Sequence, residues 1–385
     1  MRPPSEAERR RLHELFAELC AIESPFGREE AIAARVTDEL RGMGLTVERD
    51  GFGNLLARIP GAAGAPRSIL LCAHLDTVPN HGPIEPVEVD EGWENAREDI
   101  LGADNKAAVA VMLVAAARAA AEPAPVGVEL LFTLQEENAL VGAKAFDVSQ
   151  LRSEYGFVFD HATPIGEIIM ASPTYYRLRA ELHGKAAHAG IRPEDGRSAI
   201  AAAARAIAAM RLGRLDDETT ANVGSIEGGL PGSTNIVPER CSFLAETRSL
   251  DDAKVEAVVQ EMIDAIQDAA NDPVCDVDAD VTVERLFQGY RHKPSSPAIR
   301  AAESALRACG YEPRPIVTGG GADANAFEAA GFHCVNLANG TERAHEPTER
   351  VSFDALEGML GVTYALLEAC AADPAAAADS ASATY

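Results

Sequence analysis

The stretch RSILLCAHLDTV (residues 67–78) is an apolar run that ends in a histidine and an aspartate, His74 and Asp76. Consecutive apolar residues are typical of a strand that is buried on both faces, because side chains on both sides of the strand must then avoid water. The stretch therefore predicts a buried strand whose carboxyl end delivers two polar side chains.

The segments around this strand predict further helices and buried strands in alternation. LGADNKAAVAVMLVAAARAAAE (residues 101–122) predicts a turn and a long helix, because it is rich in alanine, the best helix former. VGVELLFTLQEE (126–137) and YGFVFDHA (155–162) predict two further buried strands, and amphipathic helices are expected at 6–20 and 29–42. Alternating strands and helices predict βαβ units, so we expect an α/β domain whose sheet is mostly parallel.

The pattern changes near residue 173, where TYYRLRAELHGKAA alternates as a half-buried strand does. Two helices and further strands follow, and the strand–helix rhythm returns near residue 294. We therefore expect an α+β domain, residues 174–290, inserted into a larger α/β domain formed by residues 1–173 and 291–371. The low-complexity tail, residues 372–385, is expected to be disordered.

The composition excludes some classes of partner. The formal net charge of −26 argues against nucleic acid, whose binding needs clusters of lysine and arginine. The sequence contains no run of about 18 apolar residues, so no membrane span is expected. The N-terminus shows no apolar signal region. The seven cysteines are scattered without a C-x-x-C pair, which is typical of a reducing compartment. We expect a cytoplasmic protein with no membrane and no nucleic-acid partner.

Polar residues recur where the predicted strands of the larger domain end. Each one alone is more often structural, and an aspartate before a helix is a common N-cap. Together they are harder to explain, because a buried strand that ends in unpaired carboxylates is costly without a cation. Two histidines and several carboxylates suit zinc, manganese or cobalt. The candidate residues are His74, Asp76, Asp104, Glu136, Glu137, Asp160 and His345.

A series of motifs, in order along nearly the whole chain, resembles the M20 family of co-catalytic zinc metallopeptidases, and within it the peptidase T-like branch. The motifs are HLDTVP, ILGADNKAAVA, LFTLQEENALVGA, FVFD, HGKAAHAGIRPEDGRSAI, GLPGSTNIVP, AETRSLD and GGGADANAF, followed by a late histidine. The resemblance implies a zinc-peptidase-like catalytic domain with an inserted α+β lid that also dimerises. It implies two divalent ions per chain, zinc in the first place, with cobalt or manganese as alternatives.

The resemblance also implies roles for the residues of the catalytic domain. His74 and Asp160 would bind one ion, Glu137 and His345 the other, and Asp104 would bridge them. Asp76 would accept the second imidazole N–H of His74 and fix its tautomer. Glu136, the neighbour of a ligand, would be the general base that takes a proton from the attacking water.

The resemblance extends to the lid. His188 in HGKAAHAGIRPEDG would stabilise the oxyanion, Asn235 in GSTNIVP would hold the substrate, and Arg248 in AETRSLD would bind its carboxylate. We expect a homodimer formed through the lid, and whether His188 serves its own or the partner's site stays open. One departure is Asn105, where the family commonly has a second aspartate.

The expected function is the hydrolysis of an amide bond in short peptides by an exo-acting, aminopeptidase- or tripeptidase-like enzyme. An amidohydrolase that deacylates N-acyl amino acids is the alternative, since the same site cleaves either amide. A non-catalytic metal-binding protein is a remote alternative, because it would leave Glu136 without a role. The native metal and the preferred side chain stay open.

Overall fold

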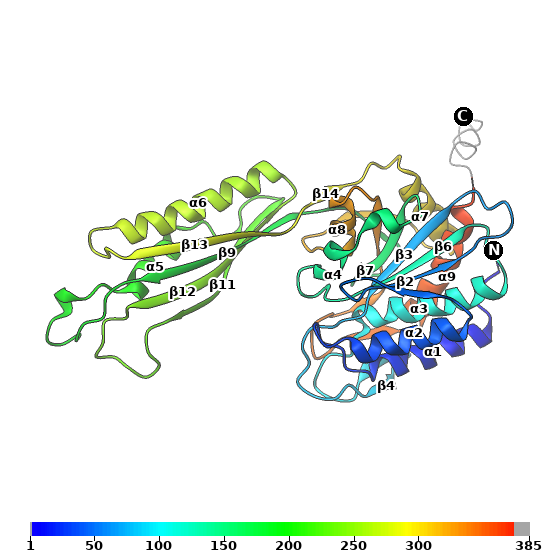
Figure 1. Cartoon of the computed structure of the whole chain (residues 1–385), viewed down its shortest axis with the longest axis horizontal. Coiled ribbons are helices and arrows are strands. Elements are labelled where there is room, and N and C mark those ends of the chain that lie inside the picture. The colour runs from blue at the N-terminus through cyan, green and yellow to red at the C-terminus, as the bar shows by residue number, and fades with distance from the viewer. Residues whose placement is uncertain (1, 373–385) are drawn as a thin grey trace. The chain divides into compact units, whose positions relative to one another are not determined.

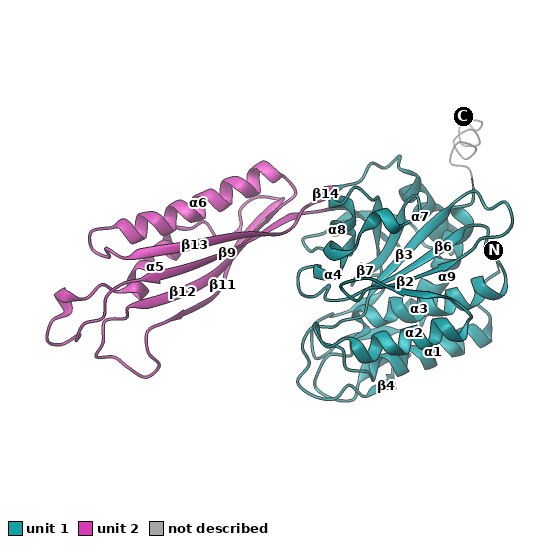
Figure 2. Cartoon of the chain, in the orientation of Figure 1, with its two compact units in different colours: residues 1–171, 291–385 teal, residues 172–290 magenta. Residues whose placement is uncertain are grey.

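The computed structural model describes residues 2–372, and these form two compact units (Figure 2). Unit 1 contains residues up to 171 and from 291, and unit 2 contains residues 172–290. The inserted domain expected from the sequence, 174–290, begins two residues after the start of unit 2. The expected disordered tail lies outside the described residues apart from Ala372.

Unit 1 is built on a mixed sheet, in which the described residues form nine strands (Figure 1). The neighbours β6, β3, β7 and β16 run parallel at its centre, which confirms the predicted α/β class. The strands, in sheet order, are β1 (Val47–Arg49), β2 (Leu55–Ile59), β6 (Gly127–Thr133), β3 (Ser68–His74), β7 (Gly156–His161), β16 (Cys334–Ala338), β8 (Glu167–Ser172) and β14 (Tyr290–Arg291), with β15 (Arg314–Val317) beside β8. A smaller sheet contains β4 (Pro86–Val89), β5 (Gly92–Asn95), β18 (Arg350–Ser352) and β17 (Thr341–Glu342).

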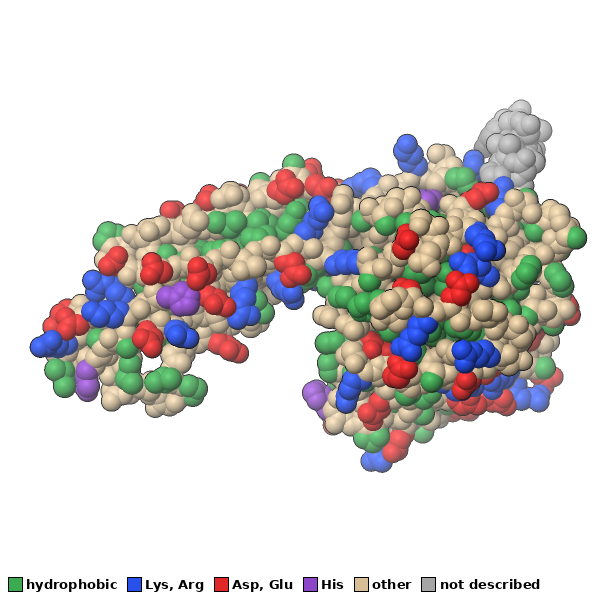
Figure 3. All heavy atoms as spheres, viewed as in Figure 1, with side chains coloured by type: hydrophobic (Ala, Val, Ile, Leu, Met, Phe, Trp, Pro, Cys, Tyr) green, Lys and Arg blue, Asp and Glu red, His purple; other side chains and the backbone are tan. Residues whose placement is uncertain are grey.

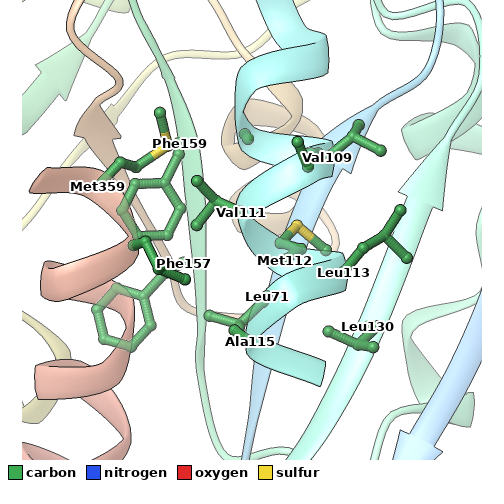
Figure 4. Packing of buried hydrophobic residues seen from close by; sticks show 14 of the residues in the cluster. Leu71, Val109, Val111, Met112, Leu113, Ala115, Leu130, Phe157, Phe159 and Met359 are labelled. Atoms are coloured by element: carbon green, nitrogen blue, oxygen red, sulfur yellow. The ribbon is translucent and has the colours of Figure 1, made fainter. Parts of the chain in front are cut away.

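Helices cover both faces of the large sheet. The alanine-rich α3 packs through Val111 toward Phe157, and Leu71 of β3 belongs to the same buried cluster (Figure 4). The next residue of β3, Cys72, points to the opposite face, where its Sγ lies 3.8 Å from Asp323 of α8. The helices of unit 1 are α1 (Glu6–Cys20), α2 (Glu30–Gly42), α3 (Ala103–Ala121), α4 (Val141–Ala145), α7 (Pro297–Ala308), α8 (Asp323–Ala329) and α9 (Phe353–Ala369), with a 3-10 turn at Val148–Gln150.

Unit 2 is the expected α+β insertion. Its antiparallel strands, in sheet order, are β10 (Gly213–Arg214), β11 (Thr219–Gly228), β12 (Arg240–Ser249), β9 (Thr174–His183) and β13 (Asp278–Phe287). Its helices are α5 (Ala199–Ala209) and α6 (Asp252–Asn271), with a 3-10 turn at Pro193–Asp195. Leu178 and Ala180 of β9 and Phe243 of β12 share one core with these helices, because alternate strand residues face the same side.

The surface carries both signs of charge. On the face shown in Figure 3, acidic and basic side chains are interspersed over each unit. None of the helices within residues 2–372 has the length and apolar character needed to cross a membrane.

Candidate metal centre

The five predicted metal ligands gather at one edge of the unit 1 sheet. His74 is the last residue of β3, Asp160 lies in β7, and Glu137 follows β6. Because these three strands run parallel, their carboxyl ends meet at the same edge, where ligands of open α/β sheets collect. Asp104 enters from the start of α3, and His345 comes from the loop between β17 and β18.

Asp104 stands between the two histidines. Its Oδ1 lies 3.5 Å from Nε2 of His74, and its Oδ2 lies 3.4 Å from Nε2 of His345. The N-cap of α3 is Gly102, which leaves the Asp104 carboxylate free of capping, and the φ and ψ of Asp104 are −81° and 104°. A single carboxylate therefore faces both imidazoles, which is the geometry a bridging ligand requires.

The remaining ligands complete two groups of donor atoms. Oδ1 of Asp160 lies 3.6 Å from Nε2 of His74, and Oε1 of Glu137 lies 2.8 Å from Nε2 of His345. Donor atoms lie within 4.8 Å of one another in two overlapping sets, His74–Asp104–Glu137 and His74–Glu136–Asp160. The adjacent glutamates thus belong to different sets, although they are neighbours in the chain.

The donor atoms fit a cation better than they fit each other. Among the described residues, Oδ1 of Asp104 and Oε1 of Glu137 are buried and take part in no hydrogen bond, although a histidine nitrogen lies near each. Buried carboxylate oxygens without a partner are costly. Converging nitrogen and oxygen donors of this kind are the set that a zinc-like ion prefers.

The carboxylates make this edge strongly negative. Burial by itself lowers the pKa of His74, but the nearby carboxylates of Asp160, Asp104 and Asp76 outweigh it and raise that pKa well above its usual value. Asp104 and Glu137 raise the pKa of His345 to about 10. Burial, with the charge of Asp104, raises the pKa of Asp160 to about 7. A divalent cation would supply the positive charge that protonated imidazoles otherwise provide.

Asp76 holds three other residues of the centre in place. Its Oδ1 and Oδ2 accept the backbone N–H groups of Glu136 and Glu137, each at 2.9 Å. Its backbone carbonyl lies 3.0 Å from Nδ1 of His74, and its carboxylate lies 3.5 Å from the same nitrogen. The role expected for Asp76 toward His74 is thus shared with its own carbonyl group. Its hydrogen bonds to the backbone of both glutamates were not expected from the sequence.

Glu349 is a second clamp that sequence reasoning missed. Its carboxylate is buried and accepts the backbone N–H groups of Leu101, Gly102 and Asp104 at 2.8–2.9 Å. Glu349 follows His345 by four residues. Its hydrogen bonds therefore connect the loop that carries His345 to the turn that carries Asp104. In the sequence Glu349 is one of 60 acidic residues, and no local signal separates it from a surface glutamate.

Asn105 occupies a closed position. It is fully buried, and its side-chain amide makes no hydrogen bond to the described residues. The neutral amide adds no charge to an edge that already has a surplus of carboxylates. The departure from the common aspartate therefore places a neutral buried amide, rather than a further carboxylate, beside Asp104.

The other predicted residues lie in unit 2. His188 and Asn235 are exposed and lie together, since Ala189 donates its N–H to the Asn235 carbonyl at 2.9 Å and His188 forms a β-bridge with Ile236. Arg248 lies on β12, where its guanidinium donates to Glu246 at 3.0 Å.

Comparison with known proteins agrees with this architecture. The dimerisation-domain model of M20 peptidases matches residues 174–273, and the model of peptidase family M28 matches residues 54–186. The protein YqjE of Bacillus subtilis, itself uncharacterized, is 37% identical over 94% of this chain and 99% of its own length.

Two solved structures are similar over nearly the whole chain. The aminopeptidase PepT from Bacillus cereus has a TM-score of 0.84 at 35% identity, over 94% of this chain and 99% of its own. A tripeptidase from Staphylococcus aureus has a TM-score of 0.87 at 29% identity, over 94% and 98%. Sequence motifs, fold and these similarities agree, and the chain belongs to the M20 family of metal-dependent peptidases, in its peptidase T-like branch.

Proposed function

We propose that this peptidase is an aminopeptidase that removes the N-terminal residue of short peptides with the help of two divalent ions, zinc in the first place. The observation that carries the proposal is the division of labour between Glu136 and Glu137. Asp76 fixes both backbone N–H groups, and the two side chains then join different donor sets. In this proposal Glu137 is a ligand, and Glu136, held beside it, acts as the base rather than as a ligand.

The proposed ligand assignment follows the contacts. His74 and Asp160 hold one ion, and Glu137 and His345 hold the other. Asp104 bridges them, which is supported by its two oxygens facing different histidines. When bound, such a pair of ions polarises the scissile carbonyl and makes water a stronger nucleophile.

Glu136 carries the proton in this proposal. Burial and the charge of Asp160 raise the pKa of Glu136 well above its usual range. A carboxylate whose pKa is raised toward the working pH can take a proton from the attacking water and return it to the leaving amine. The surplus of carboxylates at this edge also favours a substrate that carries a free α-ammonium group, as a peptide N-terminus does.

Unit 2 supplies recognition. His188 donates a hydrogen bond to the developing oxyanion, and Asn235 helps to hold the substrate. Arg248 binds the carboxylate of a free-acid peptide, and the ring of Tyr175, 4.1 Å from the guanidinium carbon, orients it. The match to a dimerisation domain supports a homodimer formed through unit 2.

A substrate panel tests the proposal. The metal-reconstituted protein is given tripeptides and dipeptides with a free N-terminus, the same peptides with an acetylated N-terminus, and N-acetyl amino acids. We expect hydrolysis of the free peptides and release of their first residue. Faster hydrolysis of N-acetyl amino acids would instead assign the protein to the deacylases.

Metal content gives the second test. We expect two ions per chain at this centre and loss of hydrolysis after chelation. Adding zinc, cobalt or manganese to separate samples restores activity and ranks the metals. Full activity in a preparation without any metal would contradict the proposal.

A further inference from the structure

A second cluster of metal-binding side chains lies in unit 1, away from the centre described above. His292 directly follows β14, Glu328 lies in α8, and His333 directly precedes β16. One donor atom from each lies within 4.8 Å of the others, and the cluster shares no residue with the two donor sets around His74. The three residues come from separate segments that the fold brings together.

The three side chains lie close together, and neighbouring residues contact two of them. Nδ1 of His333 lies 2.7 Å from Oε1 of Glu328, and Nδ1 of His292 lies 3.8 Å from the same oxygen. The imidazole rings are 4.8 Å apart and nearly perpendicular. The Cys334 N–H donates to Oε1 of Glu328 at 2.8 Å, and Oγ of Ser296 lies 3.1 Å from Nε2 of His333. Glu328 and His333 are thus each held in place by a further contact.

The chemistry of the three groups matches a known donor set. Two imidazoles and one glutamate are donors that zinc binds, and a water would complete the tetrahedron. Metal-binding histidines commonly use their second nitrogen for a hydrogen bond to a neighbouring oxygen, and Nε2 of His333 has such a partner in Oγ of Ser296, which leaves Nδ1 toward Glu328 and the proposed ion. His292 is buried, and burial lowers its pKa to about 4, so its ring stays neutral and keeps a lone pair at neutral pH.

The cluster lies where the chain passes between the units. The chain leaves unit 1 after residue 171 and returns at residue 291. The N–H of His292 donates to the carbonyl of Met170 at 2.7 Å, which joins the two crossing segments. An ion held by His292 would therefore tie both segments to α8 and to β16.

We propose that His292, Glu328 and His333 form a third site for a divalent transition-metal ion such as zinc, and that this ion fastens the two segments that connect the units. The site is structural in this proposal, and it takes no part in the cleavage of the substrate. It stands independently of the roles proposed for Glu136 and the two catalytic ions.

Metal counting tests the site. The full-length protein is stripped with chelator, reloaded with zinc, freed of excess zinc and measured by elemental analysis. We expect His333→Ala and Glu328→Gln to hold one ion per chain fewer than the wild type. The matched control His183→Ala, which removes a half-buried imidazole of unit 2 whose ion-pair partner among the described residues is Asp280, should hold the wild-type number. Equal metal content in the wild type and both cluster variants would overturn the proposal.

Two further measurements cover the case in which the variants fold poorly. Anomalous scattering at the zinc edge, from wild-type crystals grown with zinc, should show a peak between the three side chains. Zinc should also slow hydrogen exchange in residues 168–172 and 288–294 of the wild type, but not of Glu328→Gln. Zinc peaks confined to the centre around His74 and His345 would show that the cluster is only a hydrogen-bonded contact, which would refute the site.

Discussion

The candidate residues of unit 1 are held more tightly than those of unit 2, except for His345, whose side chain is about half exposed on its loop. In unit 1, Asp76 and Glu349 fix the backbone of the donor residues through buried carboxylates. In unit 2, His188 and Asn235 are exposed and lie on loops. A buried and clamped group is preorganised for chemistry, whereas an exposed group is completed only by what covers it. We therefore expect unit 1 to carry the ligands and the base, and unit 2 to add an oxyanion donor and contacts to the substrate.

The sharpest test of unit 1 separates its adjacent glutamates. Glu136→Gln should keep the fold and the metal content, yet lower kcat by about 10²–10⁴-fold, because a general base is lost. Glu137→Gln should lose one ion, because a ligand is lost. Elemental analysis and steady-state kinetics of both variants decide the matter. Equal metal content together with equal activity in the two variants would refute the division of roles.

The corresponding test of unit 2 removes an exposed histidine. His188→Ala should keep its metal and lower kcat by about 10²–10³-fold, the usual effect of losing one oxyanion donor. His183→Ala, in the same unit, is the matched control and should retain wild-type kcat. A normal kcat for His188→Ala would remove unit 2 from the chemistry.

Mixed dimers then show which site His188 serves. Inactive Glu136→Gln and inactive His188→Ala proteins are combined and allowed to exchange subunits. If His188 acts on the partner's site, one site of each mixed dimer has both groups intact and activity returns. Verified exchange without recovery would place His188 in its own chain's site or outside the reaction.

A smaller effect is expected from the clamp at Glu349. Glu349→Gln places an amide N–H₂ group against backbone N–H donors, so the turn that carries Asp104 should loosen. Supporting residues of this kind typically change metal affinity by about 10–100-fold. Metal affinity is measured by competition with a chelator, and Glu346→Gln on the same loop, which is exposed, is the control. Equal affinities for the two variants would show that the clamp does not support the centre.

The smallest expected effect is the release of a proton when the metal binds. In the metal-free protein the pKa of His345 is raised to about 10, above an ordinary value of about 6.5. This shift stabilises the metal-free fold at low pH, and the contribution is lost as the pH rises through about 10. A metal ligand must be deprotonated, so metal binding at pH 8 should release a proton from His345, and this release should vanish well above pH 10. Calorimetry in buffers of different ionisation enthalpy measures it, and release that does not change with pH would contradict the shift.

Much of unit 1 follows from local sequence. Short apolar runs such as residues 69–73 favour buried strands, and the alternation of strands with helices favours a mostly parallel sheet. Parallel strands align their carboxyl ends, so His74, Glu137 and Asp160 could be placed at one edge before any coordinates were known. The division of the chain into a larger domain and an insertion followed from the same change of pattern.

The contacts that position the candidate metal ligands could not be predicted from the sequence pattern. Glu349 accepts the N–H of Asp104 across 245 residues, and His292 meets Glu328 and His333 only after three segments have packed. The sequence predicts a contact between Asp76 and His74. The Asp76 carboxylate also accepts the backbone N–H groups of Glu136 and Glu137. Such contacts depend on directions of N–H groups and on distances between loops, which periodicity does not encode. The sequence by itself determined which residue types reach the edge of the sheet, and only the tertiary structure decided which atoms face one another, because that depends on how separate segments pack.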